Sequence, residues 1–139
     1  MIKRVLVTIT DSHRTSDEDY SLELTTAGTY RQTDGGFSLT YDEVGESLQG
    51  CKTQLVFSCD GTIAMHRTGQ YSTDMIFERQ HRHTNFYSTP YGELMMGIYS
   101  NDVSYEPAEN GGRLHLEYTV DINSDLASEN KLDIIFTFK

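Results

Sequence analysis

Apolar and polar side chains alternate one by one along most of the chain, and this alternation constrains the fold more than any other feature. The clearest run is RLHLEYTVDI, residues 113–122, in which every second residue from Leu114 onward is apolar and those between are mostly polar. The same period of two recurs at 20–30, 37–42, 51–57, 63–66, 74–78, 94–98 and 132–138. Successive side chains of a β-strand point to opposite faces of the sheet, so the period predicts strands with one buried face each.

Turn-forming residues separate these runs at intervals of about ten residues, as at Asp60-Gly61 and Asn110-Gly111-Gly112. Proline is confined to Pro90 and Pro107, which suits breaks or bulges between ladders. No stretch shows a convincing helical period. Eight to ten short amphipathic strands joined by tight turns predict an all-β chain, folded as an up-and-down antiparallel barrel or as a sandwich. The period alone does not choose between the two.

Length and charge narrow the function classes. At 139 residues the chain is expected to form a single domain, 1–139. Eleven basic against twenty-one acidic residues give a net charge of −10, which argues against DNA, RNA or anionic lipid as a partner. No apolar run approaches the length of a membrane span, and the N-terminal residues do not resemble a signal peptide. We therefore expect a cytoplasmic protein with neither nucleic acid nor membrane as partner.

The two cysteines, Cys51 and Cys59, are eight residues apart. On one extended segment this spacing is about 26 Å, far beyond the reach of a disulfide. We interpret both as buried free thiols in a reducing compartment, without a redox or nucleophilic role.

An ordered set of segments resembles a known family. The segments are FSLTYDE (37–43), DGTIAMHRTG (60–69), MIF (75–77), YSTPYGEL (87–94) and LHLEYTVDIN (114–123) followed by NKLDI (130–134). In order and spacing they resemble the YwiB-like bacterial β-barrel family, a lipocalin-like (calycin-type) domain of unknown function. The resemblance implies a closed antiparallel barrel in a cytosolic bacterial protein and supplies no catalytic residues. One departure from many lipocalins is the absence of any tryptophan in this chain.

Charged residues on the predicted inner face are the first candidates for a site. Glu43 continues the apolar positions 37, 39 and 41, and Arg67 continues Ile63 and Met65. Arg79 continues Met75 and Phe77 in the same way and is also expected to point inward. A buried charge needs a partner. One interpretation is therefore an Arg67–Glu43 ion pair that is hydrogen-bonded by a tyrosine and closes one end of the barrel. The alternative is that Arg67 offers its guanidinium to a ligand carboxylate or phosphate. The candidate ligand-binding residues are Arg67, Glu43, Tyr41, Tyr87, Tyr118, Met65, Met75, Phe77 and Met96.

His81 and His83 are the only histidine pair with a spacing that suits chelation, because they would share one face of a strand about 6.6 Å apart. Two ligands do not complete a metal site, and a third would have to come from His66, Asp74, Glu78 or a distant loop. We interpret residues 78–84 as a polar hairpin at the barrel rim and predict no metal or other cofactor.

Three functions remain open. The first is binding of a small apolar or amphipathic molecule in an internal cavity of at least about 300 Å³. The second is a scaffold or interaction protein with a packed barrel, acting through its outer surface or as a homodimer through Ile76, Tyr99 and Ile135. The third is a cavity enzyme using Arg67, Glu43 and a tyrosine. Because no hydrolase, metalloprotease or nucleotide-binding motif is present, a non-enzymatic role is favoured.

Overall fold

The computed structural model describes residues 2–42, 51–68, 73–89 and 92–139, with the side chains of 87–89 excepted. In these ranges the chain forms strands only, and no helix is long and apolar enough to cross a membrane. The strands are β1 (Ile2–Arg14), β2 (Asp19–Thr33), β3 (Gly36–Asp42), β4 (Lys52–Ser58), β5 (Ile63–Thr68), β6 (Thr73–Phe77), β7 (Arg82–Thr89), β8 (Gly92–Ala108), β9 (Gly111–Ile122) and β10 (Asp125–Phe138).

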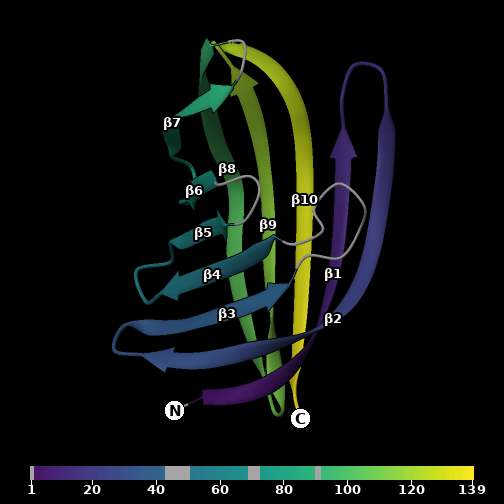
Figure 1. The fold of residues 1–139 in the computed structure, drawn as a ribbon, viewed down its shortest axis with the longest axis vertical. Helices are drawn as coiled ribbons and strands as arrows, with labels where there is room; N and C mark the ends of the chain where they lie inside the picture. Colours follow the sequence, from purple (N-terminus) through teal and green to yellow (C-terminus); the bar gives the residue numbers. More distant parts are fainter. Residues whose placement is uncertain (1, 43–50, 69–72, 90–91) are drawn as a thin grey trace.

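The ten strands form one antiparallel sheet in the order β6-β5-β4-β3-β2-β1-β10-β9-β8-β7. Strands that follow one another in the sequence pair with each other, except β6 and β7, and a long ladder between β1 and β10 joins the two ends of the chain. The sheet coils into a nearly closed barrel, in which the short strands β3 to β6 run across the long strands β8 to β10 (Figure 1). The prediction of an up-and-down antiparallel barrel is confirmed.

The seam of the barrel lies between β6 and β7, so closure is less complete than predicted. Within the described residues these two strands share no ladder. They are linked by a hydrogen bond of 2.7 Å from Asn85 Nδ2 to the carbonyl of Asp74, while an isolated bridge joins Arg79 to Ser100 of β8. The predicted hairpin 78–84 is therefore a short turn that ends where β7 begins at Arg82.

Three expectations about burial are wrong. Cys59 was expected to be buried but is exposed, because β4 ends at Ser58. Arg79 was expected to point inward after Phe77, but its side chain is 66% exposed, because β6 ends at Phe77 and Gln80 takes a left-handed φ of 61°. Tyr20 and Leu22 lie on the predicted inner face of β2, yet they are exposed, because β3 pairs only with residues 28–33 of that strand. The β1–β2 hairpin thus extends beyond the short strands (Figure 1).

An arginine clamp ties the edge strand β7 to β9 across β8. Arg82 donates through Nε and Nη2 to the carboxylate of Asp121, at 3.0 and 2.6 Å. The guanidinium passes so close to Gly97 that a Cβ there would lie 2.3 Å from Nη2. A glycine at this position of β8 is therefore what allows the clamp to lie against the sheet.

The clamp makes a prediction about pH. The hydrogen bond from Arg82 holds the pKa of the Asp121 carboxyl below its ordinary value. A depressed pKa in the folded state stabilises the protein above the ordinary carboxyl pKa, and this contribution is lost as the pH falls through the lowered value. We expect an NMR titration of Asp121 to show the low midpoint, and Arg82→Gln to raise it. Arg31→Gln, at an exposed position on β2, is the control and leaves the midpoint unchanged; equal midpoints in all three proteins would contradict the clamp.

Candidate functional site

One end of the barrel interior is filled by aromatic rings. Tyr30 and Phe37 stack with ring centroids 5.2 Å apart, and Tyr105 packs against Phe37 at 5.0 Å and Phe57 at 4.9 Å. Phe136 completes the cluster, 5.5 Å from Phe37. These rings belong to β2, β3, β4, β8 and β10, so they connect opposite walls of the barrel at this end.

The other half of the interior carries a polar row. The register places Ser100 of β8 opposite Tyr118 of β9, Tyr118 opposite Asn130 of β10, and Asn130 opposite His13 of β1. Ser100, Tyr118 and Asn130 are all buried, with exposures of 0, 7 and 4%. Four neighbouring strands therefore present polar groups to the interior at one level.

Opposite charges lie near this row. His13 Nε2 is 3.0 Å from a carboxylate oxygen of Asp11 on β1. Arg67 of β5 donates from Nε to Thr53 Oγ1 at 3.4 Å. Burial raises the pKa of the Tyr118 phenol well above its ordinary value; the charge of Asp11 adds to this shift and the charge of Arg67 opposes it. The Tyr118 hydroxyl thus senses an anion from β1 and a cation from β5.

Some polar atoms in the interior have no partner. Within the described part of the chain, Thr73 Oγ1, Ser100 Oγ and Asn130 Oδ1 are buried without a hydrogen bond, although Asn130 Nδ2 donates to Ser128 Oγ at 3.0 Å. A buried polar atom left unsatisfied costs about 1–3 kcal/mol. In folded proteins such atoms are satisfied by an ordered water or by a polar group of a ligand.

The structure brings most of the predicted ligand-binding residues together. Tyr41, Met65, Phe77 and Tyr118 are buried in one core cluster, and Met75 and Met96 pack against it half-buried. The rings of Phe77 and Tyr118 meet at 4.8 Å.

Two predicted residues cannot be placed. Tyr87 lies on β7 opposite Leu94, but its side chain is outside the described residues. Glu43 also lies outside them, so the Arg67–Glu43 ion pair stays a prediction. The internal cavity also stays a prediction, because residues 43–50 and 69–72, which follow β3 and β5, lie outside the described part of the chain.

The predicted histidine pair meets at a shared carboxylate. His83 Nε2 lies 2.9 Å from Glu78 Oε1, and His81 Nδ1 lies 3.7 Å from Glu78 Oε2. The His81 side chain is 65% exposed, and its Nδ1 also lies 3.0 Å from the carbonyl of Arg79. His66, one of the proposed third ligands, is instead paired with Asp74 at 2.7 Å.

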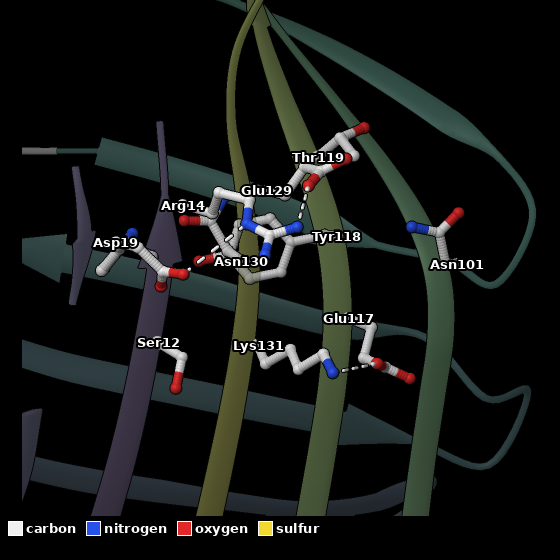
Figure 2. Close-up of a pocket in the computed structure, with 11 residues that line it drawn as sticks. Ser12, Arg14, Asp19, Asn101, Glu117, Tyr118, Thr119, Glu129, Asn130 and Lys131 are labelled. Atoms are coloured by element: carbon white, nitrogen blue, oxygen red, sulfur yellow. Dashed lines mark ion pairs between the residues drawn. The ribbon is translucent and has the colours of Figure 1, made fainter. Parts of the chain in front are cut away.

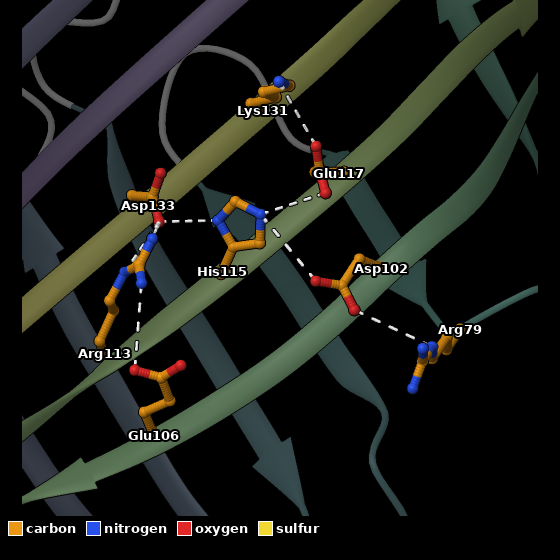
Figure 3. A network of polar contacts seen from close by, with 8 residues as sticks. All are labelled: Arg79, Asp102, Glu106, Arg113, His115, Glu117, Lys131 and Asp133. Carbon is orange, nitrogen blue, oxygen red and sulfur yellow. Dashed lines mark hydrogen bonds and ion pairs between the residues drawn. The ribbon is translucent and has the colours of Figure 1, made fainter.

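A second polar cluster, on the outer face of β8, β9 and β10, was not predicted (Figure 3). His115 lies at its centre, with Nδ1 2.7 Å from Asp133 Oδ1 and Nε2 facing Glu117 at 3.3 Å and Asp102 at 3.9 Å. Arg113 Nε donates to Asp133 Oδ1 at 3.0 Å. Alternation correctly placed His115 and Glu117 on the outer face of their strand, but it could not reveal their partners on neighbouring strands.

The carboxylates around His115 raise the pKa of its imidazole. Burial lowers the pKa of the imidazole, but the hydrogen bonds to Asp133 and Glu117 and their negative charges outweigh burial, so the pKa lies above the ordinary histidine value. Burial likewise raises the pKa of the Asp133 carboxyl, and the bonds from His115 and Arg113 reverse this and lower it.

A groove of about 410 Å³ adjoins this cluster on the outer face (Figure 2). Arg14 bridges its upper part, 3.7 Å from Asp19 and 3.9 Å from Glu129, and Lys131 lies 3.5 Å from Glu117 across the lower part. Most of the lining consists of outward-facing polar side chains, so this hollow is not the predicted apolar cavity. Glu117 and Lys131 belong to both the groove and the His115 cluster.

Comparison with known proteins identifies the family. A family model described as "Domain of unknown function (DUF1934)" matches residues 7–134. The chain belongs to this family. The crystal structure of ywiB protein from Bacillus subtilis superposes with a TM-score of 0.83 over 99% of this chain and 93% of that chain, at 18% sequence identity. At this identity the likeness shows the fold alone. No curated protein matches the sequence significantly.

The resemblance to YwiB-like barrel proteins is thereby confirmed. The lipocalin-like assignment and the bacterial, cytosolic setting stay predictions.

Proposed function

We propose that this DUF1934 protein binds a small amphipathic molecule in the polar half of its barrel interior. The observation that carries the proposal is the presence of buried polar atoms without partners, Ser100 Oγ and Asn130 Oδ1, on the inner face of β8 and β10. A ligand with a hydroxyl or amide group would satisfy them, and each satisfied atom would recover the cost of its desolvation.

The surroundings define the chemistry of such a ligand. Beyond the polar row, Phe77 and the half-buried Met75 and Met96 offer an apolar and adaptable wall. Arg67 of β5, the strand beside β6, and Asp11 of β1 place charge near the Tyr118 hydroxyl. An apolar body with one polar or anionic end fits this division better than a fully polar metabolite.

The two other functions have less support. Ile76, Tyr99 and Ile135 are exposed, at 45, 36 and 48%, as the homodimer hypothesis requires. They lie on β6, β8 and β10 and are not register neighbours, so they do not form one apolar patch. For a cavity enzyme, Glu43 lies outside the described residues, and Tyr118, with its raised pKa, is a poor proton acceptor or donor near neutral pH.

Native mass spectrometry on untagged protein, purified without metal resin, tests the proposal. We expect an additional mass that is retained under native conditions and lost on denaturation. Ser100→Ala should reduce the ligand-bound fraction, while the ligand-free variant unfolds at the same temperature as wild type or higher, because an unsatisfied hydroxyl has been removed. Ser21→Ala, at an exposed position on β2, is the matched control. A bare polypeptide mass under native conditions would contradict a tightly bound ligand.

A further inference from the structure

Strand geometry places three potential metal ligands on one patch of the outer face. His115 and Glu117 are two residues apart on β9, so their side chains leave the same face of the sheet. Asp102 of β8 lies directly opposite Glu117 in the register. One ligand atom from each residue falls within 4.8 Å of the other two. Because all three residues belong to paired strands, the backbone holds them in place.

The separations match those of a metal coordination sphere. In tetrahedral zinc sites the Zn–N and Zn–O bonds are about 2.0–2.2 Å, which puts neighbouring ligand atoms about 3.4 Å apart. Here Nε2 of His115 lies 3.3 Å from Glu117 Oε2 and 3.9 Å from Asp102 Oδ2. The ligand oxygens of Asp102 and Glu117 lie within 4.8 Å of each other, and binding of one ion requires the Asp102 side chain to move closer to Nε2 of His115.

The remaining atoms of the ligands are held by other residues. Asp133 lies 2.7 Å from Nδ1 of His115, which fixes the tautomer that leaves Nε2 available. Lys131 approaches Glu117 through Oε1, and Arg79 approaches Asp102 through Oδ1, at 3.5 and 3.9 Å (Figure 3). Each carboxylate therefore turns one oxygen toward His115 and the other toward a cation. This division is typical of metal ligands with supporting outer contacts.

We propose that Asp102, His115 and Glu117 form a site for a divalent transition metal of the Zn²⁺ class on the outer face of the barrel. One imidazole and two carboxylates suit Zn²⁺, Mn²⁺ or Fe²⁺ better than Ca²⁺, which takes six to eight oxygen ligands. The two carboxylates balance the charge of the ion. Three protein ligands leave at least one coordination position for water or a small ligand, and Glu117 also lines the adjoining groove.

Cobalt binding followed by zinc competition tests this site. Untagged protein is freed of metal with a chelator and titrated with Co²⁺ in mildly alkaline buffer, which favours the neutral imidazole that a metal requires. We expect one ion per chain, a visible absorption band of a four- or five-coordinate Co²⁺ centre, and loss of that band on addition of Zn²⁺. Zn²⁺ should also raise the unfolding temperature of the wild-type protein.

Variants separate this site from other histidines. His115→Gln and Glu117→Gln should each weaken binding at least about a hundredfold, and Asp133→Asn, which keeps all three ligands, about 10- to 100-fold. His66→Gln is the matched control, because His66 forms a similar pair with Asp74 at 2.7 Å but has no part in the proposed site. His83→Gln controls for the histidines that contact Glu78.

Absence of Co²⁺ and Zn²⁺ binding at micromolar concentrations would overturn the proposal. So would binding that survives both His115→Gln and Glu117→Gln, or binding that is lost with His83→Gln instead. All the substituted side chains are partly exposed, and circular dichroism of the metal-free variants verifies that each one folds. The test is independent of the interior ligand, because the metal ligands face away from the barrel interior.

Discussion

Replacing Phe136 with alanine is expected to lower the free energy of unfolding by about 3–5 kcal/mol, the usual cost of deleting a fully buried aromatic ring. Phe136 is 1% exposed, and its ring lies 5.5–5.9 Å from those of Phe37, Tyr30 and Phe138. The ring also fills the space above Gly112, where a Cβ would lie 2.9 Å from Phe136 Cζ. Since the neighbours come from opposite walls, the barrel cannot collapse easily around the cavity that is left.

The neighbouring residue provides the control for this change. Ile135 points outward from the same strand and is 48% exposed, so Ile135→Ala should cost less than about 1 kcal/mol, within the range of strand propensity. Urea unfolding with equal slopes for all three proteins measures both differences. Similar losses for the two variants would mean that the aromatic cluster does not hold the barrel together.

For most strands, the sequence predicts which side chains are buried, because each strand has one apolar face. In β9, Leu114, Leu116 and Tyr118 are buried and His115 is directed outward, as the alternation predicts. In β10, Leu132, Ile134 and Phe136 are buried in the same way. Here burial of apolar area determines the register, and a shift of one residue would turn every apolar side chain outward.

A β-bulge explains why the His115 cluster was not found from the sequence. The register between β8 and β9 shifts between Ser100 and Asp102. Even-numbered residues of β8 up to Ser100 face inward, but beyond the bulge the odd-numbered Val103 and Tyr105 pack against the core. Asp102 is thereby turned outward beside Glu117. A bulge inserts one unpaired residue and reverses the alternation, and no local sequence pattern marked its position here.

The contacts between side chains on neighbouring strands could not be predicted from the sequence either. Asp133 contacts His115 because β9 and β10 pair in a register set by the turn between them and by the bulge at Leu126–Ser128. Arg79 was assigned to the wrong face because a turn with positive φ at Gln80 interrupts the alternation. In both cases the sequence shows which charged side chains are present, but their orientation and partners depend on bulges and turns in the backbone.

Two hairpins at the aromatic end each begin a strand with a glycine that lies very close to a backbone carbonyl, and substitution of such a glycine is expected to lower the stability strongly. At Gly111 a Cβ would lie 1.9 Å from the carbonyl oxygen of Phe136, and at Gly36 it would lie 1.9 Å from that of Phe57. The φ angles are alike, at 153° and 157°. In both hairpins the carbonyl of the preceding residue accepts a backbone hydrogen bond: Asn110 from Phe138 at the end of β10, at 2.9 Å, and Gly35 from Cys59 just after β4, at 2.6 Å.

Gly111→Ala is therefore expected to destabilise the protein by at least about 2 kcal/mol, since the new methyl group would collide with backbone rather than with a movable side chain. The collision would push β9 away from the carbonyl of Phe136 and loosen the aromatic end. Gly35→Ala is the control, because a Cβ there meets nothing within 4 Å, and we expect almost no change. Thermal and urea unfolding measure both variants. Equal stability of Gly111→Ala and Gly35→Ala would contradict the close approach of β9 to β10 at this hairpin. It would also remove the support for a rigid aromatic end, and with it the argument that a ligand binds in the polar half of the interior.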